Sequence, residues 1–212
     1  MQPPPYRIET ERLVVRCWEP RDAPLLRDAL DTSLEHLRPW MPWAAAQPQD
    51  LDTTFEQLRA FRGHFDSGVE FIYGIFDRDE QAVLGGAGLH PRIGAGALEI
   101  GYWIRASAVR NGFMSEAAAA LTRVAFSVCR VHRVEVRIDP ANEASCGVPR
   151  KLGFVEEARL RRRLPPVLPG DEWHDALVFA LLADEFPAAA ASARALTIAA
   201  YDVAGRRLAL DP

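Results

Sequence analysis

Hydrophobic and polar positions along the chain follow two periods, one typical of strands and one typical of helices. Short apolar or alternating runs predict strands at residues 12–18, 71–77, 82–90, 97–104, 133–139 and 173–182. Apolar residues three or four positions apart predict amphipathic helices over 20–37, with Asp22 as N-cap, over 51–65 and over 114–128. A strand, a long helix and a second strand in succession predict a parallel, right-handed crossover beside an antiparallel meander. The expected fold class is therefore α+β, a mixed and mostly antiparallel sheet with helices on both faces.

Two later segments are less regular. Residues 144–154 predict a short helix, which we expect to be irregular because Pro149 lies inside it. Residues 196–210 alternate enough to form a small hairpin. We therefore expect one main domain, residues 8–186, and an appended C-terminal element, residues 187–212. The sequence leaves open whether this element pairs with the main sheet, with a second subunit or with nothing.

The composition is that of an ordinary globular protein, with 49% hydrophobic and 25% charged residues among 212. No apolar run approaches the roughly 20 residues that span a bilayer, and the N-terminus has neither a basic start nor an apolar signal region. We therefore expect a cytoplasmic protein without a membrane partner. The net charge is −4, and acidic residues are interspersed among the arginines, which argues against a nucleic-acid partner.

The cysteines and one basic run add little chemistry. Cys17, Cys129 and Cys146 stand at spacings of no metal or redox motif, so we expect reduced thiols and no metal site. The basic run over 159–164 is typical of a solvated strand edge, and the alternative is a patch for an anionic ligand.

The segment VRNGFM, residues 109–114, joins a predicted strand to the clearest predicted helix. The free N–H groups at a helix N-terminus and the helix dipole attract anions, phosphate above all. Gly112 lets the backbone approach an anion, Arg110 adds a positive charge, and Ser115 can cap the helix or donate to a phosphate oxygen. An ordinary strand-to-helix bend is the alternative. The glycine spacing excludes a Walker loop and a dinucleotide fingerprint.

Four motifs stand in one order along the chain: IETERLVVR, LEIGYWIRASAVRNGFMSEA, HRVEVRIDPANEAS and RKLGF. Together they resemble the GNAT superfamily of N-acetyltransferases, and within it the type that acetylates ribosomal-protein N-termini or spermidine. The resemblance covers residues 8–186 and implies the GNAT fold, with two parallel strands that splay apart. It implies direct transfer of acetyl from acetyl-CoA to an amine acceptor, a protein N-terminus or a small molecule. No metal and no covalent enzyme intermediate is implied.

The resemblance also implies where acetyl-CoA binds. Its pyrophosphate would meet backbone N–H groups of the turn and first helical residues, which are Arg110, Asn111, Gly112, Phe113, Met114 and Ser115. Its pantetheine arm would lie beside the preceding strand like an added strand, at Trp103, Ile104 and Arg105. Val109 and Met114 depart from the residues that the family prefers in this turn.

Amide formation needs a group that takes the ammonium proton and a donor for the leaving thiolate. The resemblance implies that Ser145 donates to the sulfur and that Asn142 orients the cofactor, although both residues also suit the start of a helix. Glu99, an acid in an apolar strand, is the expected base and would act through water. The alternative base is His174 with Asp175, because the resemblance implies that the polar start of the last long strand lies near the acceptor pocket.

The acceptor site is expected at the rigid aromatic segment LRPWMPW. Trp40 and Trp43 would form a wall of this site or contact an amine through a cation–π interaction, and the alternative is that they anchor the loop on the core. Arg105 or Arg137 near the thioester could favour an acidic acyl group such as succinyl. Two other readings stay open: an acyl-CoA-binding sensor or structural module without acceptor chemistry, and a subunit whose C-terminal hairpin forms a homodimer.

Overall fold

The computed structural model describes residues 1–167, 170–189 and 197–210. Within them, one sheet contains nine strands. These are β1 (Arg7–Glu9), β2 (Leu13–Cys17), β3 (Phe71–Asp77), β4 (Val83–His90), β5 (Ala97–Ile104), β6 (Arg133–Ile138), β7 (Val155–Leu164), β8 (His174–Leu182) and β9 (Ala199–Tyr201). The α-helices are α1 (Ala23–Asp31), α2 (Leu34–Leu37), α3 (Leu51–Asp66), α4 (Phe113–Ser127) and α5 (Glu143–Leu152). Short 3₁₀ turns are η1 (Pro20–Asp22), η2 (Pro42–Ala46), η3 (Ala106–Ala108) and η4 (Phe186–Ala188).

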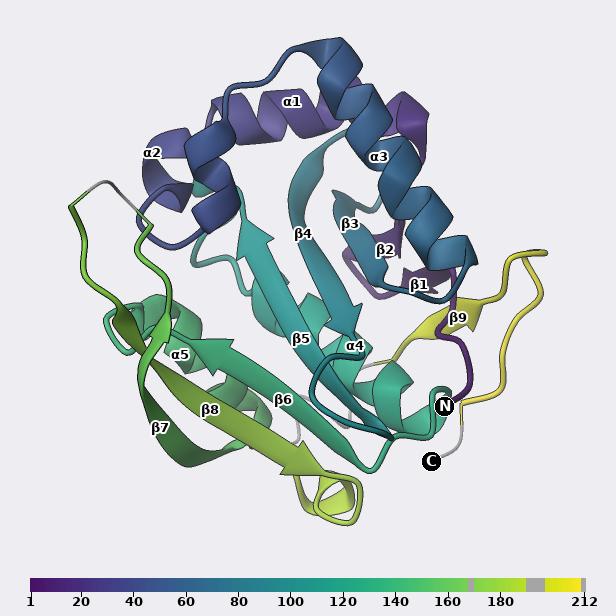
Figure 1. The fold of residues 1–212 in the computed structure, drawn as a ribbon. Coiled ribbons are helices and arrows are strands. Elements are labelled where there is room, and N and C mark those ends of the chain that lie inside the picture. The colour runs from purple at the N-terminus through teal and green to yellow at the C-terminus, as the bar shows by residue number, and fades with distance from the viewer. Residues whose placement is uncertain (168–169, 190–196, 211–212) are drawn as a thin grey trace.

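The strands lie in the order β7-β8-β6-β5-β4-β3-β2-β1-β9 (Figure 1). Neighbouring strands are antiparallel, with the exception of β5 and β6, which are parallel and joined through α4. This arrangement confirms the predicted fold class, the meander and the parallel crossover. The three-residue strand β1 was not predicted, because RIE is too short to show a period.

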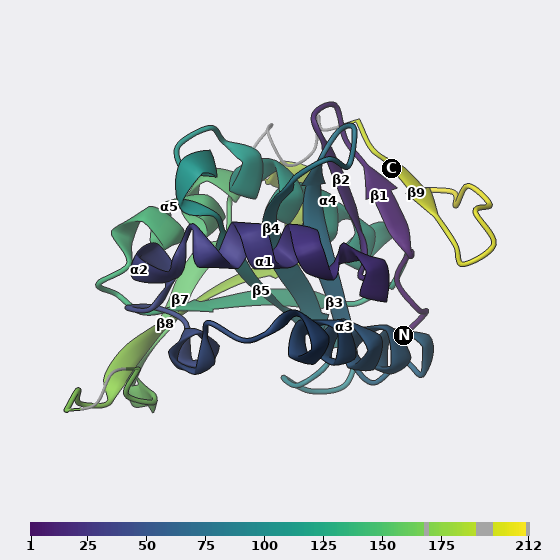
Figure 2. The ribbon, with the colours of Figure 1, turned by 90° about the horizontal axis from the view of Figure 1, so that it is seen from above.

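Helices cover both faces of the sheet (Figures 1 and 2). One layer consists of α1 and α3, which contact each other and β2–β4, and the other consists of α4 and α5, which contact each other, β2 and β4–β7. Alternation along β2 divides the core accordingly: Val14 packs with α1 and α3, whereas Leu13 and Val15 pack with α4. The sequence period of two therefore sets which residues each helix layer covers.

The parallel strands β5 and β6 diverge soon after they meet (Figure 1). They are paired only over Ala97–Glu99 and Arg133–Glu135. Beyond these residues β5 stays paired with β4 as far as Ile104, and β6 stays paired with β8 as far as Ile138. A gap therefore opens between the carboxyl ends of the two strands, as the resemblance implied.

Two local expectations near the N-terminus hold only in part. Asp22 is the N-cap residue of α1, but its side chain makes no capping hydrogen bond, because its carboxylate accepts hydrogen bonds from Arg16 at 2.7 and 2.9 Å. The helix predicted over 20–37 is divided into η1, α1 and α2. The break contains Ser33, whose hydroxyl accepts the N–H of Ala106 at 3.0 Å. Long-range partners thus override the local helical period.

The C-terminal element completes the far edge of the sheet. β9 pairs antiparallel with β1, with Ile8 opposite Ala200. The chain then turns and comes back, so that Leu208 donates its N–H to the C=O of Ala200 at 2.8 Å. This turn lies within the segment 196–210, for which the sequence predicts a hairpin. Residues 190–196 of the appended element lie outside the described residues.

Candidate active site

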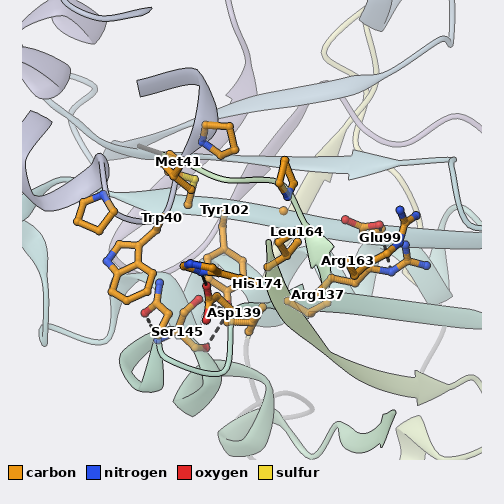
Figure 3. Close-up of a pocket in the computed structure, with 18 of the residues that line it drawn as sticks. Trp40, Met41, Glu99, Tyr102, Arg137, Asp139, Ser145, Arg163, Leu164 and His174 are labelled. Atoms are coloured by element: carbon orange, nitrogen blue, oxygen red, sulfur yellow. Dashed lines mark hydrogen bonds and ion pairs between the residues drawn. The ribbon is translucent and has the colours of Figure 1, made fainter. Parts of the chain in front are cut away.

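A cavity of about 500 Å³ opens at the gap between β5 and β6 (Figure 3). Its walls come from the loop before η2, from both strands, from the start of α5 and from the facing ends of β7 and β8. The expected site residues that line it are Trp40, Glu99, Arg137, Asn142, Ser145 and His174. Arg92, Tyr102 and Asp139 also line it and were not expected as site residues, and Arg163, another lining residue, belongs to the basic run over 159–164.

The edge of β5 that faces this gap carries backbone groups that β6 does not pair. Arg105 donates its N–H to the C=O of Leu84 in β4 at 2.8 Å. Because backbone donors change side at each residue of a strand, Trp103 also directs its N–H toward β4. The N–H and C=O groups of Tyr102 and Ile104 then face the gap. An extended chain with amide groups could pair with them as an added strand does.

Tyr102 and Ser145 are joined by two hydrogen bonds across the gap. The Tyr102 hydroxyl donates to the C=O of Ser145 at 3.0 Å, and Ser145 Oγ lies 3.4 Å from the same hydroxyl. In a helix this carbonyl would accept the N–H four residues later, but Pro149 has none. The tyrosine therefore replaces the missing donor, and α5 is a continuous helix, contrary to our expectation. Burial raises the pKa of Tyr102, which keeps its hydroxyl protonated.

The loop between β6 and α5 positions Ser145. Asn142 is the N-cap of α5, and its Oδ1 accepts the N–H of Ser145 at 3.1 Å. The N–H of Asn142 donates to the C=O of Asp139 at 2.9 Å. Asn142 thus fulfils the capping role that helix-start chemistry predicts, and it fixes the serine at the mouth of the gap.

His174 lines the cavity from the start of β8 and pairs through Nδ1 with the carboxylate of Asp139 (Figure 3). This hydrogen bond raises the pKa of His174. Asp175, the partner expected from the sequence, instead accepts hydrogen bonds from Arg159 Nε at 2.8 Å and from the N–H of Arg162 at 2.9 Å. Adjacent strand residues point to opposite faces, so Asp175 lies away from the cavity. Local spacing could not show the real partner, which lies 35 positions earlier.

Glu99 is buried at the base of the gap beside two arginines. Its carboxylate is 2.5 Å from Arg92 and 3.7 Å from Arg137, and Arg137 is also 3.1 Å from Glu135. A water that relayed a proton to Glu99 would compete with these guanidinium groups for its lone pairs. The expected base is therefore present at the cavity but is held in an ion-pair cluster.

The turn before α4 presents the helix N-terminus. Gly112 is the N-cap of α4, has φ +77° and supplies no side-chain cap. The N–H groups of Phe113, Met114 and Ser115 are therefore the free donors that begin every helix. Arg110 has φ +62°, a left-handed conformation that glycine adopts more easily. This geometry fits a pyrophosphate group.

The IETERL motif holds this turn in place. Glu116 in the first turn of α4 accepts Thr10 Oγ1 at 2.6 Å and Arg12 Nε at 2.7 Å. Arg12 also donates to the C=O of Asn111 at 3.0 Å, and its guanidinium lies 4.7 Å from the centre of the Phe113 ring. Arg12 therefore adds a second positive charge beside the turn. The motif could be recognised in the sequence, but its contact with Glu116 could not, because the contact joins residues about a hundred positions apart.

The two tryptophans of the aromatic loop line different cavities. Trp40 lines the cavity at the gap, whereas Trp43 packs edge-on against Trp103, with 5.9 Å between ring centroids, in a neighbouring cavity. Arg105 extends toward α1, where it donates to Asp28 at 3.1 Å. Arg105 is therefore not placed to meet an acyl group, unlike Arg137, which lines the gap.

Two further findings concern the described part of the chain alone. None of its helices has both the length and the apolarity needed to cross a membrane. Among the same residues, no three His, Cys, Asp or Glu side chains gather closely enough to hold a metal ion.

Comparison with known proteins agrees with this geometry. Residues 12–155 match the family model described as Acetyltransferase (GNAT) domain. The chain is 29% identical over 183 residues to [Ribosomal protein uS5]-alanine N-acetyltransferase of Escherichia coli K12, which covers 84% of this chain and 91% of that protein. It is 28% identical over 183 residues to the putative ribosomal N-acetyltransferase YdaF of Bacillus subtilis, which covers 83% of this chain and 94% of that protein.

The fold also matches solved structures. Mycobacterium smegmatis RimJ in complex with CoA-disulfide superposes with a TM-score of 0.75 and 25% identity, over 90% of this chain and 92% of that chain. The family model covers residues 12–155 of this chain. This range includes the helix N-terminus after Gly112 and the diverging strands β5 and β6. The chain belongs to the GNAT acetyltransferase family and is an acetyl-CoA-dependent N-acetyltransferase.

Proposed function

We propose that the acceptor is the α-amino group of a protein N-terminus. The observation that carries the proposal is the position of the cavity, which lies between the loop before η2 and the ends of β7 and β8. A chain end that enters this cavity, which Trp40 and Leu164 help to line, can reach the β5–β6 gap. The names of the Escherichia coli and Bacillus subtilis relatives support the same class of acceptor.

The acetyl-CoA site follows from the backbone. We assign the pyrophosphate to the N–H groups at the start of α4, with Arg12 and Arg110 as nearby positive charges. The amide groups of the pantetheine arm pair with Tyr102 and Ile104, rather than with Trp103, whose N–H faces β4. Bound acetyl-CoA supplies the thioester carbonyl that the amine attacks.

The hydroxyl groups of Tyr102 and Ser145 stabilise the leaving sulfur, one directly and one by positioning the other. Ser145 Oγ donates a hydrogen bond to the sulfur as negative charge develops on it, and Tyr102 holds Ser145 through its carbonyl. Asn142 keeps the serine in place as the cap of α5.

We assign the ammonium proton to His174. Its Nδ1 donates to Asp139, so Nε2 is the nitrogen that can accept a proton. Glu99, acting through a water, is the alternative base, although its carboxylate is already paired with Arg92 and lies 3.7 Å from Arg137.

A pH–rate profile tests this assignment. His174→Gln keeps a hydrogen bond to Asp139 but removes the base, so kcat/KM for the acceptor is expected to fall by roughly 10²–10⁴-fold near pH 7. The loss should shrink above pH 9, where the α-amine, with a pKa of about 8, is already neutral. Asp139→Asn removes the carboxylate that raises the pKa of His174, so the acidic limb of the profile should move to lower pH. If the pH dependence of kcat/KM is unchanged in His174→Gln but its acidic limb is lost in Glu99→Gln, the base is Glu99.

An acceptor panel tests the function itself. Initial rates of thiol release from acetyl-CoA are measured with short peptides, with the same peptides blocked by an N-formyl group, and with spermidine. We expect release with the free peptides and none with the blocked ones. Release with spermidine alone would refute the N-terminal acceptor.

We propose that residues 187–212 act within one chain and complete the 8–186 domain. β9 pairs with β1 of the same chain, so a protein ending at Ala189 should unfold at a lower temperature. Sedimentation is expected to give each form the same number of subunits. If truncation dissociates an oligomer, the extension serves a homodimer instead.

A further inference from the structure

A second cavity, of about 480 Å³, lies beside the first one. The two cavities share Met41, Arg92, Gly101 and Tyr102. The second cavity extends between β3–β5 and the layer of α1, α3 and η2, and its large side chains include Trp18, Leu30, Trp43, Phe61, Ile72 and Trp103. Its volume falls within the roughly 300–1,000 Å³ that is typical of small-ligand sites.

Glycines in the strands make room for this cavity. A Cβ atom on Gly86 would overlap the indole of Trp103, and a Cβ atom on Gly88 would overlap the ring of His90. Without these atoms, both rings can lie close to the strand backbone. The space above them therefore results from specific residues in the sheet.

The charge of the lining identifies the kind of guest. Among the described residues that line the cavity none is acidic, so a basic side chain would find no counterion there. Arg92 is already paired with Glu99 at 2.5 Å. Burial lowers the pKa of His90, and its Nδ1 is already paired with Glu70 at 2.7 Å. The remaining surface is mostly apolar and aromatic, which suits an uncharged apolar group.

We propose that this cavity binds a large apolar side chain from the first or second residue of the acceptor. The proposal rests on the N-terminal acceptor proposed above. The shared wall at Gly101 and Tyr102 places the cavity directly beside the strand edge where transfer would occur. A side chain next to the reacting amine can therefore enter it while the amine stays at the gap.

Two peptide series test the proposal, with Gly, Ala, Leu or Phe at the first or second position and alanine at the others. We expect kcat/KM to be at least about 10-fold higher for Leu or Phe than for Gly in one series. Gln57 lies on α3 and lines the cavity, so Gln57→Trp should fill the space and remove this preference. Phe55→Trp is the matched control, because Phe55 lies on the same helix, is 44% exposed and lies outside the cavity.

Equal kcat/KM across both series, or a preference that Gln57→Trp leaves intact, would overturn the proposal. Absence of transfer to every peptide would instead contradict the N-terminal acceptor. In that case binding of the same peptides with coenzyme A is measured by tryptophan fluorescence, since Trp43 and Trp103 line the cavity. Tighter binding of the Leu and Phe peptides supports the apolar site, and equal binding refutes it.

Discussion

The link between Tyr102 and Pro149 yields a quantitative prediction about stability. Tyr102→Phe keeps the ring and removes the hydroxyl that donates to the C=O of Ser145 at 3.0 Å. Because Pro149 offers that carbonyl no N–H, the carbonyl then has no donor from α5. An unsatisfied, partly buried carbonyl costs about 1–2 kcal/mol, so the free energy of unfolding should fall by that amount.

Pro149→Ala restores a helical N–H four residues after Ser145. In this background the carbonyl keeps a donor when the tyrosine hydroxyl is removed, so Tyr102→Phe should cost only about 0.5 kcal/mol. The double-mutant cycle should therefore show a coupling of about 1 kcal/mol, a factor of about five in the folding equilibrium.

The assay is urea unfolding of the wild type, both single variants and the double variant. Tyr73→Phe provides the control, because the Tyr73 hydroxyl donates to the C=O of Pro5 at 2.8 Å and shares no partner with Pro149. Its cost should be the same in both backgrounds. If Tyr102→Phe also costs the same in both, the hydroxyl does not replace the missing helix donor, and the reasoning fails.

Three further variants test the cofactor and sulfur sites. Ser145→Ala removes one hydrogen bond to the sulfur, so kcat in initial-rate assays should fall by roughly 10-fold. KM for acetyl-CoA should stay unchanged. An unchanged kcat would show that Ser145 takes no part in the reaction. Glu116→Gln weakens the bonds to Thr10 and Arg12, so urea unfolding should show a loss of about 1–2 kcal/mol, and calorimetry should show weaker acetyl-CoA binding. Gly112→Ala forces a side chain to φ +77° and should cost about 1–2 kcal/mol in the same unfolding assay; wild-type stability would contradict the strain.

Periodic segments were predictable from the sequence. The strands of the meander, the crossover helix and the late strand β8 bury apolar side chains at regular intervals, and this spacing can be read directly from the sequence. The first helix was predicted at about the right place, but its break was not, because it depends on a contact between Ser33 and Ala106. Pro149 was interpreted by its local effect alone, and the tyrosine that compensates for it comes from strand β5, far from α5 in the sequence.

In the candidate site, too, features set by neighbouring residues were predictable and features set by distant contacts were not. The turn around Gly112 and the capping by Asn142 are local features, and the sequence indicated both. The partner of His174 is Asp139, whereas Asp175, its neighbour in the sequence, pairs with Arg159. Nothing in the local sequence shows which of the two aspartates His174 contacts. Pairings of this kind depend on strand order and register, which a single sequence specifies only through the complete fold.

The most direct measurement is to locate the acetyl group on a peptide that carries both an α-amine and a lysine. The enzyme is incubated with acetyl-CoA and the peptide, and tandem mass spectrometry assigns the modified nitrogen. Our account predicts one acetyl group, on the α-amine, and its loss when that amine is blocked beforehand. Acetylation of the lysine side chain, or no transfer to either amine, would contradict it.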